Sequence, residues 1–217
     1  IRPGIRYAPH PALAQGADGE LLYHQLDAST LRGIDTLADF AERGSRELTA
    51  DDFAYQIRRL ASPRVQSPIR GLLHEHLAGF RELAGELAKA NAGGWLDLRA
   101  FALAGVEVVD RYTLRIRLND VYPQFQYWLA MPFFAPLPWE ADRFHSQPGL
   151  AAKNITLDWY PIGTGPYMLT VNDPNRRMVL ERNPLFRGEP YPSDGEPGDA
   201  AAGLLKDAGQ PMPFIDR

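Results

Sequence analysis

The stretch Leu48-Thr49-Ala50-Asp51-Asp52-Phe53 decides how the chain folds, because it carries a complete helix start. We expect Thr49 at the N-cap, where its hydroxyl can accept a hydrogen bond from the backbone N–H of Asp52. The two aspartates place negative charge in the first turn, against the positive end of the helix dipole. The predicted helix ends at Pro63. Its apolar residues keep helical spacing and form one buried stripe: Phe53, Ile57 and Leu60.

Further along the chain, a second helical pattern runs from Ser67 to Asn91. Ser67-Pro68 has the form of an N-cap serine followed by proline at the first helical position. Each glycine inside the pattern costs about 1 kcal/mol relative to alanine, so we expect a break near Gly79. Two short helices are expected beyond it, over residues 123–131 and 139–144.

Two segments alternate between apolar and polar residues and predict antiparallel hairpins. The first hairpin joins residues 106–109 to residues 112–118, with one face in the core and the other face in water. The second hairpin turns at Asn172-Asp173-Pro174-Asn175. In this second hairpin we expect a shared apolar face that consists of Tyr167, Leu169, Val171, Met178 and Leu180.

Four segments in a fixed order carry a family resemblance. They are Leu48–Phe53, Val108–Ile116, Ile162–Leu169 and Met178–Pro184. Taken in this order they resemble extracellular solute-binding protein family 5, the periplasmic oligopeptide- and dipeptide-binding proteins of ABC transporters. The resemblance spans about residues 1–183. Members of the family are typically more than twice as long as this chain, so the resemblance implies an internal fragment of a longer protein.

The resemblance also implies a fold. We expect an α/β chain, more exactly an α+β-like lobe of mixed helices and antiparallel strands, as part of a periplasmic-binding-protein type II two-lobe fold. Residues 1–158 would form a small lobe with a long loop insertion at residues 8–46. Residues 159–187 would be the crossover and the first hairpin of the larger lobe, and residues 188–217 a loop or linker tail.

The function that the resemblance implies is solute capture. The chain would belong to the substrate-binding component of an ABC importer, which binds peptides in a cleft between two lobes without catalysis. Its expected partners are a peptide or other small solute and the membrane permease subunits, with the binding protein itself a monomer in the periplasm. Three alternatives stay open: a sensory or protein-interaction domain, the same fold with a non-peptide solute such as a nickel chelate or an oligosaccharide, and a hydrolase whose catalytic groups follow no recognisable motif.

Composition narrows the function classes further. The 217 residues include no cysteine, so disulfides, thiol nucleophiles and thiolate metal sites are excluded. A net charge of −4 gives no electrostatic reason to expect nucleic acid as a partner. The sequence has no run of eighteen apolar residues, the length that a membrane-spanning helix needs. Residues 1–5 also lack the layout of a signal peptide, so an export signal is not expected within this chain.

Three motifs resemble metal or phosphate sites, but their spacing argues against each one. The two histidines of His74-Glu75-His76 point about 200° apart on a helix and cannot chelate one ion from one face. Asp194, Glu196 and Asp199 lack the ligand spacing of a calcium loop. Gly163-Thr164-Gly165 precedes a strand, whereas phosphate loops lead into a helix. We therefore expect no metal and no cofactor.

Catalytic groups are not expected either, because no serine lies in a nucleophile-elbow context and no acid–base set is recognisable. The candidate ligand-binding residues are aromatic. Most of the aromatic side chains are expected to pack in the core. Trp159 and Tyr160 are the exceptions: they lie just before the predicted crossover, and we expect them to line the ligand cleft.

Overall fold

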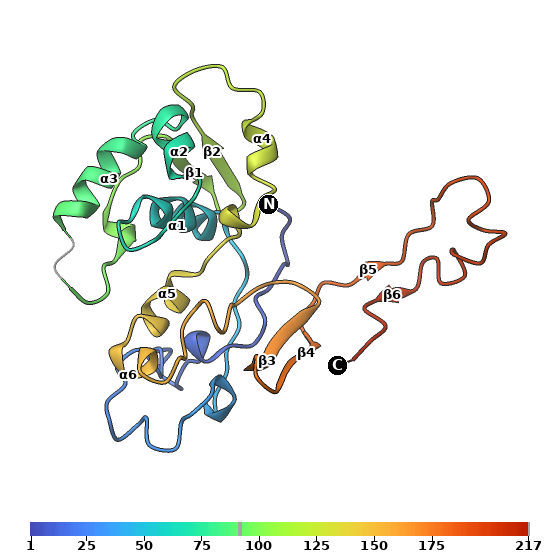
Figure 1. Cartoon of the computed structure of the whole chain (residues 1–217), viewed down its shortest axis with the longest axis horizontal. Helices are drawn as coiled ribbons and strands as arrows, with labels where there is room; N and C mark the ends of the chain where they lie inside the picture. The colour runs from blue at the N-terminus through green and yellow to red at the C-terminus, as the bar shows by residue number, and fades with distance from the viewer. Residues whose placement is uncertain (91–92, 217) are drawn as a thin grey trace.

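The computed structural model describes residues 1–90 and 93–216. Figure 1 shows a helical body with hairpins at its edges and an arm that projects from one side. The predicted mixture of helices and antiparallel strands is confirmed. The helices in the described residues are α1 (Ala50–Ala61), α2 (Arg70–His76), α3 (Phe80–Lys89), α4 (Phe125–Trp128), α5 (Trp139–His145) and α6 (Pro148–Ala151).

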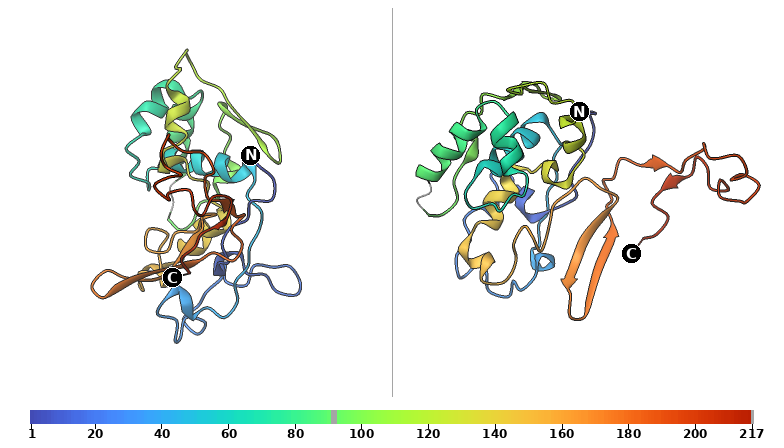
Figure 2. Two further views of the ribbon diagram at one scale, coloured as in Figure 1. Left: turned by 90° about the vertical axis from the view of Figure 1, so that its right-hand side faces the viewer. Right: turned by 45° about the horizontal axis from the view of Figure 1, so that its top comes forward.

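All described strands pair in antiparallel two-stranded ladders. The first ladder packs beside α1, the second lies between the body and the arm, and the third is within the arm (Figure 2). Each ladder joins strands that are neighbours in the sequence, so no crossover connection lies inside a sheet. The strands are β1 (Val106–Asp110), β2 (Thr113–Ile116), β3 (Tyr167–Asp173), β4 (Arg177–Arg182), β5 (Glu189–Pro190) and β6 (Pro211–Met212).

Helix α1 forms where the sequence predicts it. Thr49 is the N-cap, and its N–H donates to the Asp52 carboxylate at 3.0 Å, as in a capping box. The helix ends at Ala61, and the N–H of Ser62 closes the last turn on the Arg59 carbonyl at 3.0 Å. Its buried face lies in the main hydrophobic core, which also includes side chains of α3 and α5.

The second helical pattern divides into α2 and α3, which confirms the predicted break. Gly79 has φ of +74° and is the N-cap of α3. A Cβ there would lie 2.9 Å from the Ala104 Cβ, so both backbone conformation and space favour glycine. The predicted start at Ser67 is wrong. Residues 67–69 form a turn that buries Ile69 in the core, and α2 begins only at Arg70. The predicted end at Asn91 lies outside the described residues.

The β1–β2 hairpin matches its prediction closely. Val106 pairs with Ile116, and Val108 pairs with Leu114, before a register shift that precedes the turn. In β2 the apolar residues are partly buried and the alternating polar residues are exposed. The Ala50 N–H donates to the Arg111 carbonyl at 2.9 Å, so the hairpin turn is attached to the first residue of α1.

The β3–β4 hairpin also forms, but the predicted apolar face is partly wrong. Leu169 pairs with Leu180, and the register then shifts, so that Val171 pairs with Val179. The extra residue of this bulge reverses the alternation, because side chains change face at every residue of a strand. Val171 therefore leaves the face that it was expected to share. Met178 and Leu180 lie on the surface, with 57% and 51% of their area exposed.

Residues 8–46, which were expected to be irregular, contain the 3-10 helices η1 (Pro11–Leu13) and η2 (Leu37–Asp39). The ends of this insertion pair with one another. The His10 N–H donates to the Gly44 carbonyl at 2.9 Å, and the Gly44 N–H donates to the His10 carbonyl at 3.1 Å. A Cβ on Gly44 would overlap the Leu13 carbonyl, so this close approach requires glycine. The insertion is therefore closed at its base.

The C-terminal arm, residues 188–216, extends from the body in Figure 1 and in the right-hand view of Figure 2. It returns to the β3–β4 hairpin at its end, where the Arg182 N–H donates to the Asp216 carbonyl at 2.9 Å. The Tyr167 hydroxyl likewise donates to the Ile215 carbonyl at 3.0 Å. Among the described residues, no helix has the length and apolar character needed to cross a membrane.

Arg46 neutralises two buried carboxylates that come from different helices. Its guanidinium binds Asp52 of α1 at 2.6 and 2.9 Å, and it binds Glu140 of α5 at 2.7 and 2.8 Å. The Asp52 side chain is 2% exposed and that of Glu140 is 9% exposed. Burial disfavours the charged guanidinium, but the two carboxylates outweigh burial and raise the pKa of Arg46.

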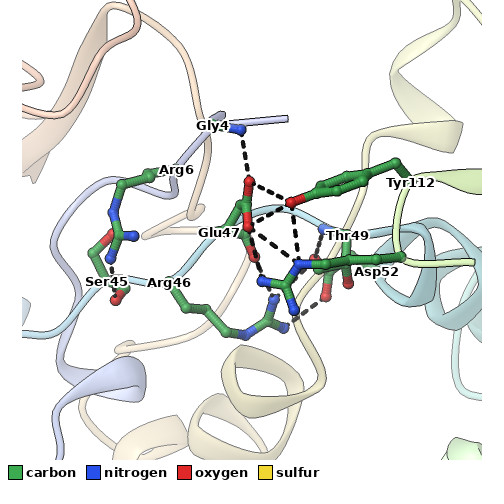
Figure 3. Close-up of polar contacts among 9 residues, drawn as sticks. Gly4, Arg6, Ser45, Arg46, Glu47, Thr49, Asp52 and Tyr112 are labelled. Atoms are coloured by element: carbon green, nitrogen blue, oxygen red, sulfur yellow. Dashed lines mark hydrogen bonds and ion pairs between the residues drawn. The ribbon is translucent and has the colours of Figure 1, made fainter. Parts of the chain in front are cut away.

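The next residue, Glu47, connects the N-terminal segment to the β1–β2 hairpin (Figure 3). The Gly4 N–H donates to Glu47 Oε1 at 2.6 Å, and the Tyr112 hydroxyl donates to the same oxygen at 3.0 Å. The Arg111 guanidinium pairs with Oε2 at 2.8 Å. These contacts, the Gly4 N–H first among them, lower the pKa of Glu47 to about 2.

Replacement of Arg46 by methionine should destabilise the chain strongly. The substitution leaves Asp52 and Glu140 buried without a cation, which costs about 3–5 kcal/mol. The matched control is Arg115→Met, which breaks a surface pair with Glu107 and should cost less than about 1 kcal/mol. Urea unfolding of the three proteins measures both differences. Equal losses for the two variants would contradict the central role of Arg46.

A candidate ligand-binding hollow beside the crossover

A hollow of about 310 Å³ lies between the insertion and the second hairpin. We call it the crossover hollow, because residues 161–163 and Gly165 of the segment that leads from α6 to β3 form part of its lining. The opposite wall consists of residues 8–10, the start of η2 and Arg43. Residues 167–170 and Leu180 complete the lining, which is mainly apolar. The hollow is thus built from segments that are far apart in the sequence.

Hydrogen bonds to the backbone hold the two walls together. The Ala8 N–H donates to the Gly163 carbonyl at 2.8 Å, which joins the insertion to the crossover segment. Asn183, which is buried, fixes the other end of that segment. Its side-chain amide donates to the Gly165 carbonyl at 2.9 Å, and its N–H donates to the Pro166 carbonyl at 2.8 Å. The crossover segment therefore reaches β3 in one defined path.

His10 is one of the lining residues, and its ring is buried against Phe144 and His145. Only 4% of the residue is exposed. Its Nδ1 accepts a hydrogen bond from the Ala12 N–H at 3.0 Å, so the proton of the neutral ring must be on Nε2. Among the described residues, no acceptor lies within hydrogen-bonding distance of that Nε2. Burial lowers the pKa of His10, and the nearby rings and charges of His145 and Arg43 lower it further.

Arg43 contributes a cation to the same lining. It is exposed, and its Nη2 makes a long contact of 3.4 Å with the Ala38 carbonyl. Within residues 1–90 and 93–216, no carboxylate lies at ion-pair distance from its guanidinium. The hollow therefore combines mainly apolar walls with one exposed positive charge, that of Arg43.

Buried histidines join the insertion to α5 beneath the hollow. His10 lies edge-on to His145, with ring centroids 5.3 Å apart. The His145 Nδ1–H donates to the Ile155 carbonyl at 3.1 Å, and the His24 Nε2–H donates to the Ala12 carbonyl at 2.9 Å. Burial lowers the pKa of His24, and it lowers that of His145 to about 4. All three rings are therefore neutral in the folded chain near pH 7.

Acidification from pH 7 to pH 5 should destabilise the chain. The unfolded histidines bind protons near pH 6.5, whereas the folded ones resist protonation, so stability is fully present above pH 6.5 and is lost as the pH falls. The shift of His145 alone corresponds to about 2 kcal/mol over this range. The measurement is urea unfolding at several pH values. His145→Gln should flatten the pH dependence, and an unchanged slope in that variant would contradict the assignment.

The two predicted ligand-binding residues lie next to the hollow rather than in its lining. Trp159 is partly exposed, at 37%, and its carbonyl accepts a hydrogen bond from the Asn172 side chain at 2.7 Å. Tyr160 is 6% exposed and packs in the main core, where burial raises its pKa. The lining of the hollow begins with the following residue, Pro161. Contact of Trp159 or Tyr160 with a solute stays a prediction.

The motifs that resemble metal or phosphate sites have ordinary contacts. His74 packs edge-on against Phe80, and His76 stacks on Tyr122 while it pairs with Asp120 at 2.9 Å. Gly163-Thr164-Gly165 leads into β3. In the described ranges, no three His, Cys, Asp or Glu side chains lie close enough together to hold a metal ion.

The sequence reasoning missed His10 and Arg43. His10 lies between two prolines and Arg43 lies in the irregular insertion, so neither belongs to a periodic pattern. The proline-flanked histidine was the only local sign that residues 8–12 adopt a defined conformation. The juxtaposition of the two side chains depends on the pairing of His10 with Gly44, which joins residues distant in the sequence.

Comparison with known proteins defines the family. Residues 44–196, more than half of the chain, match the model of the bacterial extracellular solute-binding proteins, family 5, middle region. The chain therefore belongs to this family of solute-binding proteins. The match begins at the base of the insertion and continues beyond the second hairpin, so it includes α1, both hairpins and the crossover segment.

Individual relatives match a similar share of the chain. The periplasmic oligopeptide-binding protein OppA of Salmonella typhimurium is 30% identical over 140 residues, which are 64% of this chain and 23% of that protein. The probable deoxycholate-binding periplasmic protein YgiS of Escherichia coli is 26% identical over 141 residues, again 64% and 23% of the two chains. This chain thus spans about a quarter of the length of the curated relatives that it matches.

Among solved structures, OppA of Burkholderia pseudomallei is similar, with a TM-score of 0.47 and 22% sequence identity. The similarity covers 65% of this chain and 24% of that structure.

Proposed function

We propose that this chain is part of the substrate-binding component of an ABC importer and that the complete protein binds peptides between two lobes. The observation that carries the proposal is membership of the family of extracellular solute-binding proteins, together with a 30% identical relative named as an oligopeptide-binding protein. In this proposal residues 1–158 belong to the smaller lobe, residues 159–187 begin the larger lobe, and residues 188–217 continue as a linker.

The proposal assigns recognition rather than catalysis. The crossover hollow has mostly apolar walls and a small number of polar groups, as is typical of ligand-binding sites. Backbone pairing with an extended peptide would let the protein accept many side chains, because every peptide offers the same main-chain groups. The complete protein would act as a periplasmic monomer that delivers its solute to membrane permease subunits.

An amphipathic solute is the second candidate. The relative YgiS is named as a probable deoxycholate-binding protein, and a bile acid combines an apolar body with one carboxylate. The crossover hollow offers apolar walls with a cation, Arg43, in its lining. The same protein fold could therefore carry either solute, and identification of the bound molecule separates the two.

Native mass spectrometry of the complete protein, purified without refolding, should show bound short peptides of mixed sequence. Release of the bound molecules and their sequencing identifies the cargo directly. The matched sample is the same protein after mild unfolding and refolding, which should be empty. Recovery of a bile acid or a metal chelate in place of peptides would contradict peptide transport.

The 217-residue chain alone should bind peptides with a dissociation constant weaker than about 1 mM, which corresponds to about 4 kcal/mol of binding free energy. The physical reason is that a cleft between two lobes closes around its ligand from both sides, and this chain spans 23% of its relatives' length. Isothermal titration with a mixture of short peptides tests the expectation. Micromolar affinity would contradict the two-lobe proposal.

A further inference from the structure

We propose that the base of the insertion is an acid-sensitive clasp, in which protonation of His10 detaches η1 from α5 and opens one wall of the crossover hollow. At neutral pH the clasp is closed, and residues 8–10 complete the lining of the hollow. The inference goes beyond the proposed function, because it concerns a conformational change of this chain and holds for any solute that the complete protein carries.

Two histidines hold Ala12, the middle residue of η1, through its backbone. The Ala12 N–H donates to His10 Nδ1 at 3.0 Å, and the Ala12 carbonyl accepts from the His24 Nε2–H at 2.9 Å. Ala12 is fully buried and shares the main core with Phe144 of α5, against whose ring the His10 ring also packs. The attachment of η1 to α5 therefore requires one defined tautomer of each histidine.

A protonated His10 does not fit this arrangement. An imidazolium donates from both ring nitrogens and accepts from neither. A proton on Nδ1 would point at the Ala12 N–H, so the cap of η1 would be lost and two N–H groups would face one another. The Nε2–H is buried and has no acceptor among the described residues, so the charged ring gains no hydrogen bond in place. Because an uncompensated buried charge is costly, protonation favours a ring that has moved into water.

The charged groups around His10 also disfavour the imidazolium. Burial is the main cause that lowers the pKa of His10, followed by His145 of α5 and then Arg43 of the insertion, which both add positive charge. The other charged groups near the cluster act on the neighbouring rings instead: Asp142 and Asp158 on His145, and Arg143 and Glu140 on His24. No carboxylate among the described residues pairs with the His10 ring.

The opening should stop at the Arg46 ion cluster. Arg46 lies two residues after Gly44 and joins Asp52 of α1 to Glu140 of α5. Its pKa is raised, so its guanidinium keeps its charge in acid. The elements α1, β1 and β2 contain no histidine. A fall from pH 7 to pH 5 should therefore release the base of the insertion before it unfolds α1.

Hydrogen exchange of the backbone amides, followed by NMR at pH 7 and pH 5, tests where the chain opens. Protection factors, which correct for the intrinsic pH dependence of exchange, should fall at least about 25-fold for His10, Ala12 and Gly44. One histidine that is neutral in the closed form and has an ordinary pKa in the open form contributes that factor, since protection is lost as the pH falls through 6.5. At pH 5 the amides of α1 should stay at least about tenfold more protected. Equal protection of the two regions would overturn the clasp, because the opening would then be global unfolding.

His10→Asn tests which group opens the clasp. The asparagine side chain can accept from the Ala12 N–H as an N-cap, and it does not titrate. The variant should therefore lose the 25-fold contribution. The matched control is His76→Asn, which replaces a histidine of α2 outside the cluster and should leave the fall unchanged. A wild-type fall in the His10→Asn variant would overturn the role of His10 and assign the opening to His24 or His145.

The ring nitrogens of His10 give a readout in the wild-type chain, which is independent of the folding of any variant. Their NMR shifts should show the neutral Nε2–H tautomer in the closed form at pH 7, and an imidazolium only in molecules that have lost protection at Ala12. An imidazolium in the closed form would overturn the clasp. Because no solute enters these measurements, they leave the proposed function to be decided by the bound cargo.

Discussion

The structure depends first on the charge balance around Arg46. Asp52 caps the central helix from within, and Glu140 lies at the start of α5, so both carboxylates are fixed in the interior by the helices that carry them. One guanidinium with a planar fork of donors satisfies both. The arrangement sets the spacing of α1 and α5, because two buried anions without this cation would repel one another.

The ion cluster around Arg46 is connected to the crossover hollow by the residues that precede it in the sequence. Arg46 and Glu47 lie two and three residues after Gly44, which pairs with His10, so the ion cluster and the base of the insertion are close in the chain. The His10 ring in turn packs against that of His145, the last residue of α5. The insertion is thus irregular in secondary structure but fixed at its base, and this fixed base allows an irregular segment to form one wall of a defined hollow.

The sequence predicted the elements whose signals are local. The capping residues of α1 and the alternation of β2 are carried by neighbouring residues, and both elements form as expected. Prediction from the sequence failed where contacts between residues distant in the chain determine the structure. Residues 67–69 form a turn with Ile69 buried, so α2 starts later than predicted, and a bulge after Leu169 moves Val171 to the opposite face. The Arg46–Glu140 ion pair joins residues that are 94 positions apart in the sequence, and no local pattern predicts it.

The candidate site follows the same division. Trp159 and Tyr160 were predicted as ligand-binding residues from their aromatic side chains and their position before the crossover. Tyr160 packs into the core beside the hollow. Its lining includes a histidine between prolines and an arginine in an irregular segment, and neither residue belongs to a periodic pattern. Arg43 lines the hollow without a carboxylate partner among the described residues, and the buried His10 Nε2–H has no acceptor there. Such features become visible only when the hydrogen bonds of each residue are accounted for in three dimensions.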